Sequence, residues 1–165
     1  MRTHATAYSN HKLAAVVLAL LLAITVAANA QSTRAAAGLG GTWRVQVTQV
    51  NCDTGAALFP PFQSMLTFNE DGTMIGTTLN PSFAAGQRSS DFGVWSFQGN
   101  QTYSAASEAY ILFTAGPFQR GIQRLDQTIT MNGDSWSSIA TIKFYDANHV
   151  QYIAGCALAT ASRFQ

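Results

Sequence analysis

The chain has 165 residues, of which only 10% are charged, with nine basic residues against eight acidic ones. A soluble domain usually carries about 25% charged residues, so Thr, Ser, Gln and Asn fill most of the polar positions here. Because the charges nearly balance and form no basic stripe, we expect no nucleic-acid partner.

Residues 1–30 have the pattern of a secretory signal peptide. Arg2 and Lys12 supply the positive charges, the apolar run Leu13–Ala28 follows, and Ala28-Asn29-Ala30 offers small residues at the cleavage positions. The run is shorter than the roughly 20 apolar residues of a spanning helix. We therefore expect cleavage, a secreted or periplasmic protein, and no membrane span after cleavage.

Cleavage after Ala30 would leave 135 residues, the size of one domain. We expect residues 31–40 to form a disordered leader and residues 41–165 to form a single domain. A domain of this size buries roughly two-thirds of its unfolded surface, which is enough for a hydrophobic core.

Polar and apolar residues alternate along this domain in eight segments, each bounded by turn residues, and no helical period is sustained. The expected strands are Gly41–Cys52, Gln63–Asn69, Thr73–Leu79, Phe92–Gln98, Gln101–Thr114, Gly121–Met131, Ser135–Tyr145 and His149–Leu158. Tight turns such as Glu70-Asp71-Gly72 and Asn132-Gly133 join most neighbours. Asn80–Asp91 is the longest stretch without strand character.

The two cysteines of the chain lie at the end of the first strand and within the last one, as Cys52 and Cys156. In an exported protein they are expected to form a disulfide, although two separate buried thiols are the alternative. A bridge around this long segment would stabilise the fold by about 4–5 kcal/mol in the chain-entropy model. It would also hold the first and last strands together. We therefore expect an all-β, eight-stranded antiparallel up-and-down barrel, with a β-sandwich as the alternative.

Gly41-Thr42-Trp43 at the start of the first strand resembles the calycin pattern shared by lipocalins and avidin-like proteins. That resemblance implies that Trp43 packs at the closed end of the barrel, with Arg163 across it in a cation–π contact. The lipocalin signature of the middle strands is missing. The chain also resembles small secreted bacterial proteins of unassigned function, through the same motif, Asp71-Gly72-Thr73 and Gly155-Cys156.

The calycin resemblance implies a non-enzymatic barrel that binds a small apolar or amphipathic ligand, with no cofactor. This expectation rests on analogy of fold. The candidate lining residues are Trp43, Trp95, Phe97, Tyr110 and Trp136. The alternative for the three tryptophans, and the favoured one, is that they plug a barrel end, because large aromatic side chains dominate core packing and need no ligand to explain them.

Two other functions remain open. In an isomerase of the allene-oxide-cyclase-like kind, one buried acid in a barrel pocket would act, and Glu108 is the only catalytic candidate. If its strand face, shared with Tyr110 and Leu112, points inward, burial would raise the Glu108 pKa; if it points outward, Glu108 is an ordinary surface charge. A structural or interaction module of the cell envelope, with a solidly filled core, is the other possibility.

The remaining polar residues predict little chemistry. His149 is the one histidine left after cleavage and adjoins a turn, so we expect no metal site. Arg124 and Asp126 share a strand face and are expected to form an ion pair of small energetic value. Arg88 lies in the long loop, where it could guard a barrel mouth. The sequence leaves the oligomeric state open.

Overall fold

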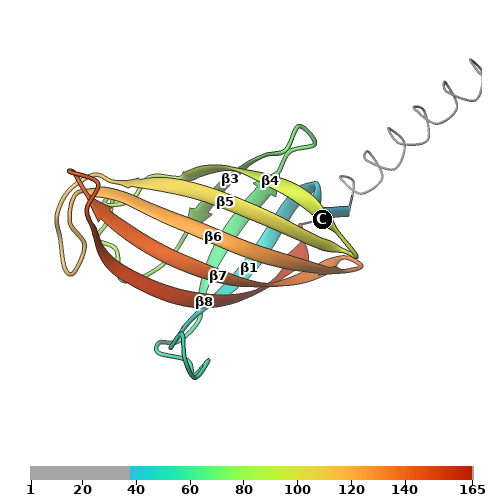
Figure 1. Ribbon diagram of the computed structural model, residues 1–165, viewed down its shortest axis with the longest axis horizontal. Helices are drawn as coiled ribbons and strands as arrows, with labels where there is room; N and C mark the ends of the chain where they lie inside the picture. Colours follow the sequence, from blue (N-terminus) through green and yellow to red (C-terminus); the bar gives the residue numbers. More distant parts are fainter. Residues whose placement is uncertain (1–37, 165) are drawn as a thin grey trace, which may run out of the picture. The chain divides into compact units, whose positions relative to one another are not determined.

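The barrel is complete in the computed structural model, which describes residues 38–164 (Figure 1). Its strands are β1 (Gly41–Val50), β2 (Phe62–Phe68), β3 (Thr73–Thr78), β4 (Asp91–Gly99), β5 (Thr102–Ile111), β6 (Gly121–Asn132), β7 (Ser135–Asp146) and β8 (Gln151–Arg163). Each strand pairs with the next, antiparallel, and β8 pairs with β1. The expected up-and-down barrel is confirmed, and the sandwich alternative is wrong because all eight strands form one closed sheet. The predicted signal peptide and residues 31–37 lie outside the described residues.

Side chains alternate between the barrel interior and its outer surface, most regularly in β5 and β7. In β7, Trp136, Ser138 and Ala140 are buried while the residues between them are exposed, and β5 repeats the pattern. A period of two places alternate residues on opposite faces of a sheet. The register therefore decides which residues of each strand face the barrel interior.

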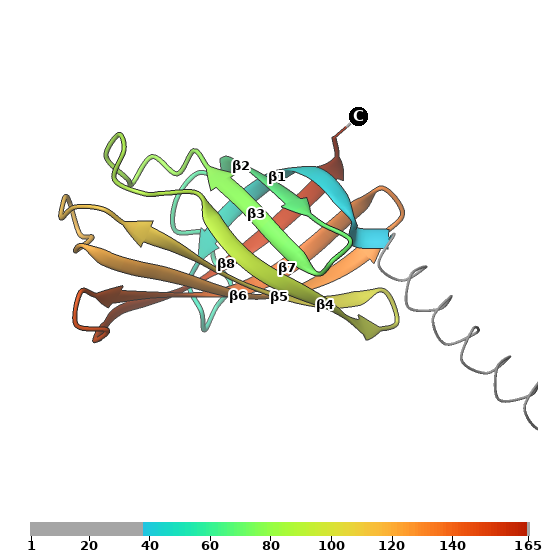
Figure 2. The same ribbon diagram turned by 90° about the horizontal axis from the view of Figure 1, so that it is seen from above.

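The first and last strands lie side by side in both views of the barrel (Figures 1 and 2). Their register runs from Trp43 opposite Arg163 to Val50 opposite Cys156. A closed sheet leaves no strand edge free to pair with another chain.

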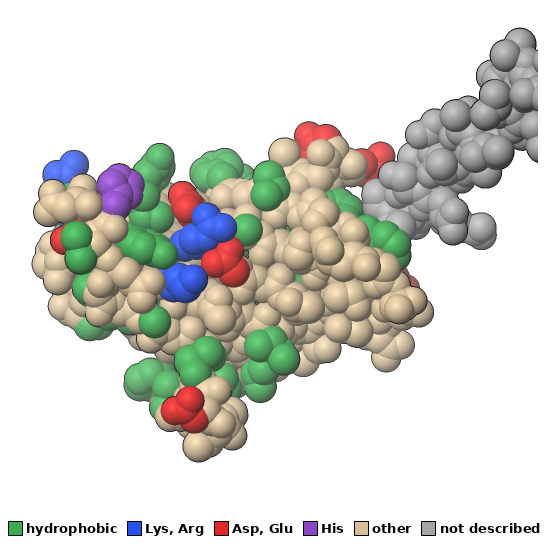
Figure 3. All heavy atoms as spheres, in the orientation of Figure 1, with side chains coloured by type: hydrophobic (Ala, Val, Ile, Leu, Met, Phe, Trp, Pro, Cys, Tyr) green, Lys and Arg blue, Asp and Glu red, His purple; other side chains and the backbone are tan. Residues whose placement is uncertain are grey.

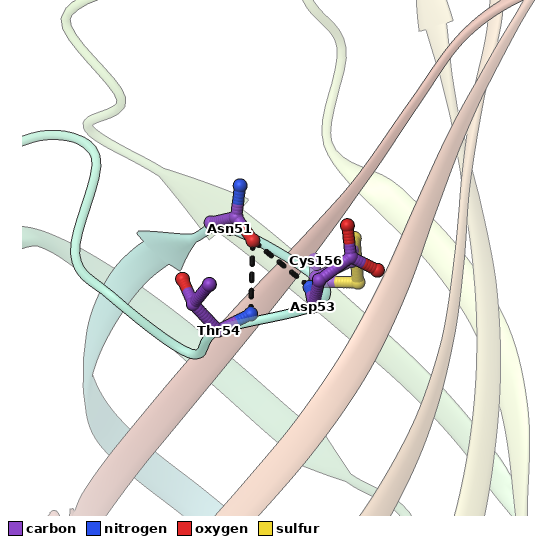
Figure 4. The surroundings of a disulfide bond; sticks show 5 residues. Asn51, Asp53, Thr54 and Cys156 are labelled. Carbon is purple, nitrogen blue, oxygen red and sulfur yellow. Dashed lines mark hydrogen bonds between the residues drawn. A yellow bond between two sulfur atoms is a disulfide. The ribbon is translucent and has the colours of Figure 1, made fainter.

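The disulfide between Cys52 and Cys156 is formed, with 5.2 Å between the two Cα atoms. Just before it, the Asn51 side chain turns the chain out of β1, because its Oδ1 accepts hydrogen bonds from the backbone N–H groups of Asp53 and Thr54 (Figure 4). The bridge confirms the predicted pairing. Such bonds are typical of oxidising compartments.

Every strand departs from its expected boundaries by at least one residue, and the larger departures concern β8, β5 and the leader. β8 continues to Arg163 rather than ending at Leu158, because β1 and β7 both offer it partners along this length. β5 ends at Ile111, short of Thr114. The leader was expected to be disordered through Gly40, but Leu39 is fully buried and belongs to the core.

The strand pairing of the barrel is shortest between β3 and β4. Only Thr73–Gly76 pairs there, with Val94–Asp91 opposite, so the pairing ends before β3 does. The following segment, residues 79–90, folds back over this region, and its end continues the line of β4 through a bridge between Arg88 and Ile111. This segment is called the mouth loop below.

Candidate functional site: the barrel interior

Two hydrophobic clusters fill the ends of the barrel and leave a cavity of about 70 Å³ between them. The larger cluster surrounds Trp43 at one end, and the smaller one surrounds Phe118 at the other. Residues of both clusters line the cavity, among them Trp136 and Ile142. The interior is therefore not solidly packed.

Arg163 and Trp43 seal one end of the barrel. The Arg163 guanidinium lies over the Trp43 ring, with its Cζ 4.3 Å from the ring centroid. It donates hydrogen bonds to the carbonyl oxygens of Gly40 and Gly38, at 2.7 and 2.9 Å. The arrangement corresponds to the one that the calycin resemblance implies for these two residues.

The three tryptophans differ in their hydrogen bonding. Trp43 donates its indole N–H to the Leu39 carbonyl oxygen at 2.9 Å, and Trp95 donates to Asn69 and Thr73 at 3.0 and 3.1 Å. The indole nitrogen of Trp136 is buried and has no partner among the described residues. Trp136 packs edge-on against Trp43, with ring centroids 6.1 Å apart, and is the tryptophan that lines the cavity.

Arg88 and Asp91 form an ion pair inside the barrel. Arg88 Nη2 lies 2.7 Å from Asp91 Oδ1, and both side chains are 6% exposed. Arg88 belongs to the mouth loop, and Asp91 is the first residue of β4. The ion pair therefore joins the end of the loop to the start of the strand that follows it. Removing one partner from such a buried pair leaves an uncompensated charge and costs about 3–5 kcal/mol.

The side chain of Gln123 extends this polar cluster. Its Oε1 accepts a hydrogen bond from Arg88 Nε, which leaves the amide Nε2 as the free end. Opposite β4, Gly76 provides the space for Asp91: a Cβ on Gly76 would lie 2.6 Å from Asp91 Oδ2. The cluster therefore combines residues of β3, β4, β6 and the mouth loop.

The mouth loop is held over the second end of the barrel by a buried amide. Gln87, which is fully buried, donates to the carbonyl oxygens of Phe113 and Ala115 at 3.2 and 2.9 Å. Its Oε1 accepts from the backbone N–H of Ala84 at 2.9 Å. One side chain thus connects the mouth loop with the segment between β5 and β6.

Aromatic rings cover the same end. The Phe83 ring of the mouth loop lies 4.6 Å from the Phe118 ring, which stacks on Phe144 of β7 at 4.8 Å, centroid to centroid. Ring packing therefore holds the part of the mouth loop around Phe83, whereas the end of the loop pairs with β5 through backbone hydrogen bonds from Leu112 N–H to the Gln87 carbonyl oxygen and from Ser89 N–H to the Tyr110 carbonyl oxygen.

A second hollow, of about 430 Å³, lies on the outer side of the mouth loop. It shares with the interior cavity a wall made of Thr78, Asn80, Phe83 and Arg88. The mouth loop therefore separates the interior cavity from the outer hollow.

Of the five expected lining residues, only Trp136 lines the interior cavity. Trp43 and Trp95 belong to the core at the closed end. The expectation for Phe97 and Tyr110 is wrong, because their side chains are 44% and 65% exposed. Tyr110 points outward by strand alternation, and Phe97 lies at the end of β4 next to a register shift.

Glu108 does not provide the buried acid of the isomerase hypothesis. Its side chain is 51% exposed on the outer face and pairs with Arg124 at 3.1 Å. Arg124 also pairs with Asp126 at 2.9 Å, which confirms that expected ion pair. Charged side chains gather over β5–β7 in Figure 3, where these residues lie, while most of the visible surface is uncharged. The isomerase hypothesis therefore has no buried acid to serve as its catalyst.

Other chemistry finds no support in the described part of the chain. Residues 38–164 contain no group of three or more His, Cys, Asp or Glu side chains placed to hold a metal ion. His149 is exposed in the turn after β7, as expected. Among the same residues, no helix is long and apolar enough to cross a membrane.

Sequence reasoning missed Asp91, Gln123 and Gln87. A signal for Asp91 was present, since it is separated from Trp95 by an even number of positions and so shares its face of β4. Gln123 lies on the inward face of β6 by the same alternation, between residues of intermediate burial, but a lone glutamine in a strand usually faces solvent. Gln87 lies in a loop, where no periodicity indicates burial.

The fold and interior together define a class of protein, an eight-stranded antiparallel closed β-barrel consistent with the calycin-like architecture. Comparison of the chain with protein-family models and with curated proteins finds no match. Its function is therefore argued from the geometry of the interior alone.

Proposed function

We propose that this protein is a secreted or periplasmic binding protein that holds a small amphipathic molecule inside its barrel. The observation that carries the proposal is the interior cavity with two chemically different sides. Ligand sites are concave, mostly apolar, and contain a few placed polar groups, and this cavity has that composition.

The apolar side of the cavity is contributed by β1, β2, β7 and β8. Its surface is formed by Val45, Leu66, Trp136, Ala140 and Ala159. Small side chains on β7 and β8 leave the free volume, because alanine at an inward position fills less space than the valine or leucine opposite. An apolar group of the ligand would gain from leaving water here, at about 25 cal/mol per Å².

The size of the cavity sets the size of the ligand. A cavity of about 150 Å³ holds a benzene-sized molecule, and the cavity here measures about 70 Å³. The enclosed part of the ligand is therefore a group of a few heavy atoms. A longer molecule would extend past Phe83 into the outer hollow.

Export is supported by the disulfide and by the first 30 residues. The Cys52–Cys156 bridge persists in an oxidising compartment, and the signal-peptide pattern would direct the chain there. Together they favour a location outside the cytoplasm.

The proposal is tested by titrating the full mature barrel with 1-butanol, a probe of suitable size, and following amide and methyl NMR shifts. We expect saturable shifts confined to inward residues such as Leu66 and Ala140. Unsaturated shifts spread over the outer face would contradict an interior site.

A matched pair of variants separates the interior from the surface. Ala140→Leu fills the cavity from β7 and should weaken 1-butanol binding at least about tenfold. Thr141→Leu adds an apolar side chain on the outer face of the same strand and should leave binding unchanged. Should Ala140→Leu not fold, Ala159→Leu on β8 makes the same test. Equal binding by the interior and surface variants would overturn the proposal.

A further inference from the structure

We infer that the polar end of the cavity, formed by Asp91, Arg88 and Gln123, selects a ligand with an uncharged head that both donates and accepts hydrogen bonds, such as a hydroxyl. This inference rests on the proposed function and specifies the chemistry of its ligand. It assigns to Asp91 and Gln123 the role of specificity-determining residues.

The charge balance of the cavity excludes an ionic head. Arg88 and Asp91 are the only charged residues among the described residues that line the cavity, and they pair with each other at 2.7 Å. Their charges cancel inside a region of low dielectric. A carboxylate or an ammonium brought there would lose its hydration without gaining an unpaired counter-charge.

The side-chain atoms of this cluster that have no partner define which hydrogen bonds a ligand can make. Arg88 uses its three nitrogens on Asp91, Gln123 and the Ser89 carbonyl oxygen. Arg88 contacts Oδ1 of Asp91 and Oε1 of Gln123. Within residues 38–164, the other two atoms of these groups, Asp91 Oδ2 and Gln123 Nε2, make no side-chain hydrogen bond. Within the cluster of Arg88, Asp91 and Gln123, one acceptor and one donor therefore remain, both on side chains that line the cavity.

A hydroxyl group satisfies both remaining atoms at once. Its hydrogen can be donated to Asp91 Oδ2, and its oxygen can accept from Gln123 Nε2. Hydrogen bonds to a charged group are the stronger kind, so the bond to Asp91 would contribute most to the selection. The apolar part of the ligand would then extend towards Trp136 on the other side of the cavity.

The absence of a side chain at Gly76 supports this placement. A Cβ at Gly76 would lie 2.6 Å from Asp91 Oδ2, so the glycine lets the carboxylate approach β3 closely. The Asp91 side chain is only 6% exposed and is also held by Arg88. A pre-positioned acceptor costs a ligand little ordering on binding.

The experiment compares three probes with the same four-carbon chain: 1-butanol, butyrate and butylammonium. Each is titrated into the wild-type barrel at constant ionic strength and followed by NMR shifts of Leu66 and Ala140. We expect 1-butanol to bind at least about tenfold more tightly than either ion, because only the ions bring an uncompensated charge into the interior. Equal or tighter binding of an ion overturns the inference, whereas no binding of any probe overturns the proposed function instead.

Two substitutions should each change which of the three probes binds most tightly. Asp91→Asn leaves the Arg88 charge unpaired, so the variant should prefer butyrate over 1-butanol. Arg88→Met leaves Asp91 unpaired, so it should prefer butylammonium. A preference for 1-butanol retained in both variants would show that the pair does not determine the selection.

Gln123→Leu provides the test if neither charge variant folds, because it removes a neutral group. It should weaken 1-butanol about fivefold to tenfold, the value of one lost hydrogen bond, and leave 1-chlorobutane, which has no hydroxyl, nearly unaffected. An equal loss for both probes would mean that Gln123 acts only through packing, and would overturn its role.

Discussion

The guanidinium of Arg163, near the end of the last strand, lies 4.3 Å from the centre of the Trp43 ring at the start of the first. The same group donates hydrogen bonds to two carbonyl oxygens of the segment that leads into β1, those of Gly38 and Gly40. One side chain therefore closes the sheet at the end opposite the mouth loop. The disulfide holds the same two strands near their other ends.

Arg163→Ala should destabilise the barrel by about 1–2 kcal/mol, since it removes a cation–π contact and two part-buried hydrogen bonds to carbonyl oxygens. Urea unfolding followed by tryptophan fluorescence measures the change. The matched control is Asp134→Asn, which breaks the ion pair of Arg163 with an aspartate that is largely exposed. It should cost less than about 0.5 kcal/mol. Equal losses in the two variants would mean that the ion pair, and not the ring contact, carries the stability.

Removal of the disulfide should cost about 2–5 kcal/mol, because the unfolded chain regains the freedom of a long loop. The test is the double variant Cys52→Ala, Cys156→Ala, compared with wild type by urea unfolding under oxidising conditions. Since the register of β1 and β8 contains eight residue pairs, the variant should still form the closed barrel. Loss of slow amide exchange along β8 would contradict that expectation.

Gln87→Leu should loosen the mouth loop without changing the sheet. The leucine keeps most of the volume but removes the three hydrogen bonds of the amide. The Ala84 N–H and the Phe113 carbonyl oxygen lose their partner, whereas the Ala115 carbonyl oxygen still accepts from the Phe118 N–H, and we expect a cost of about 2–3 kcal/mol. Hydrogen exchange should become faster in residues 79–90 and stay slow in β7. Gln119→Leu, an exposed position in the segment between β5 and β6, is the control and should change neither. Uniformly faster exchange would show that the loop does not open separately.

Tyr103 gives the barrel a dependence on alkaline pH. Burial raises the pKa of its phenol above the ordinary value of 10.0, because the charged phenolate is poorly solvated there. A group whose pKa is raised on folding contributes stability below its unfolded pKa and loses it as the pH rises through the folded pKa. The free energy of unfolding should therefore fall above about pH 10, and less steeply in Tyr103→Phe. Equal slopes for both proteins would contradict this assignment.

Most of the fold could be predicted from the sequence because its signals are local. Alternation of polar and apolar residues gives the strands, and residues such as Gly72 and Gly133, both with positive φ, mark the turns. The pairing of Cys52 with Cys156 then decides that the sheet is closed.

The interior could not be predicted in the same way, because it depends on register. A shift by one residue exchanges every inward side chain for an outward one, and both Glu108 and Tyr110 fall on the outer face for this reason. Asp91 and Arg88 are brought together by the return of the mouth loop, which no periodicity describes. Charged residues are usually expected at the protein surface, so a sequence gives little indication that Arg88 and Asp91 form a buried pair.

The most direct test of the account is an intermolecular NOE measurement on the wild-type barrel with 1-butanol. We expect contacts from the methyl end of the probe to the Trp136 indole and the Leu66 methyl groups, and from the carbon next to the hydroxyl to Gln123. Contacts only with outward residues such as Ile139, or none at saturating probe, would contradict the claim that the cavity is a ligand site.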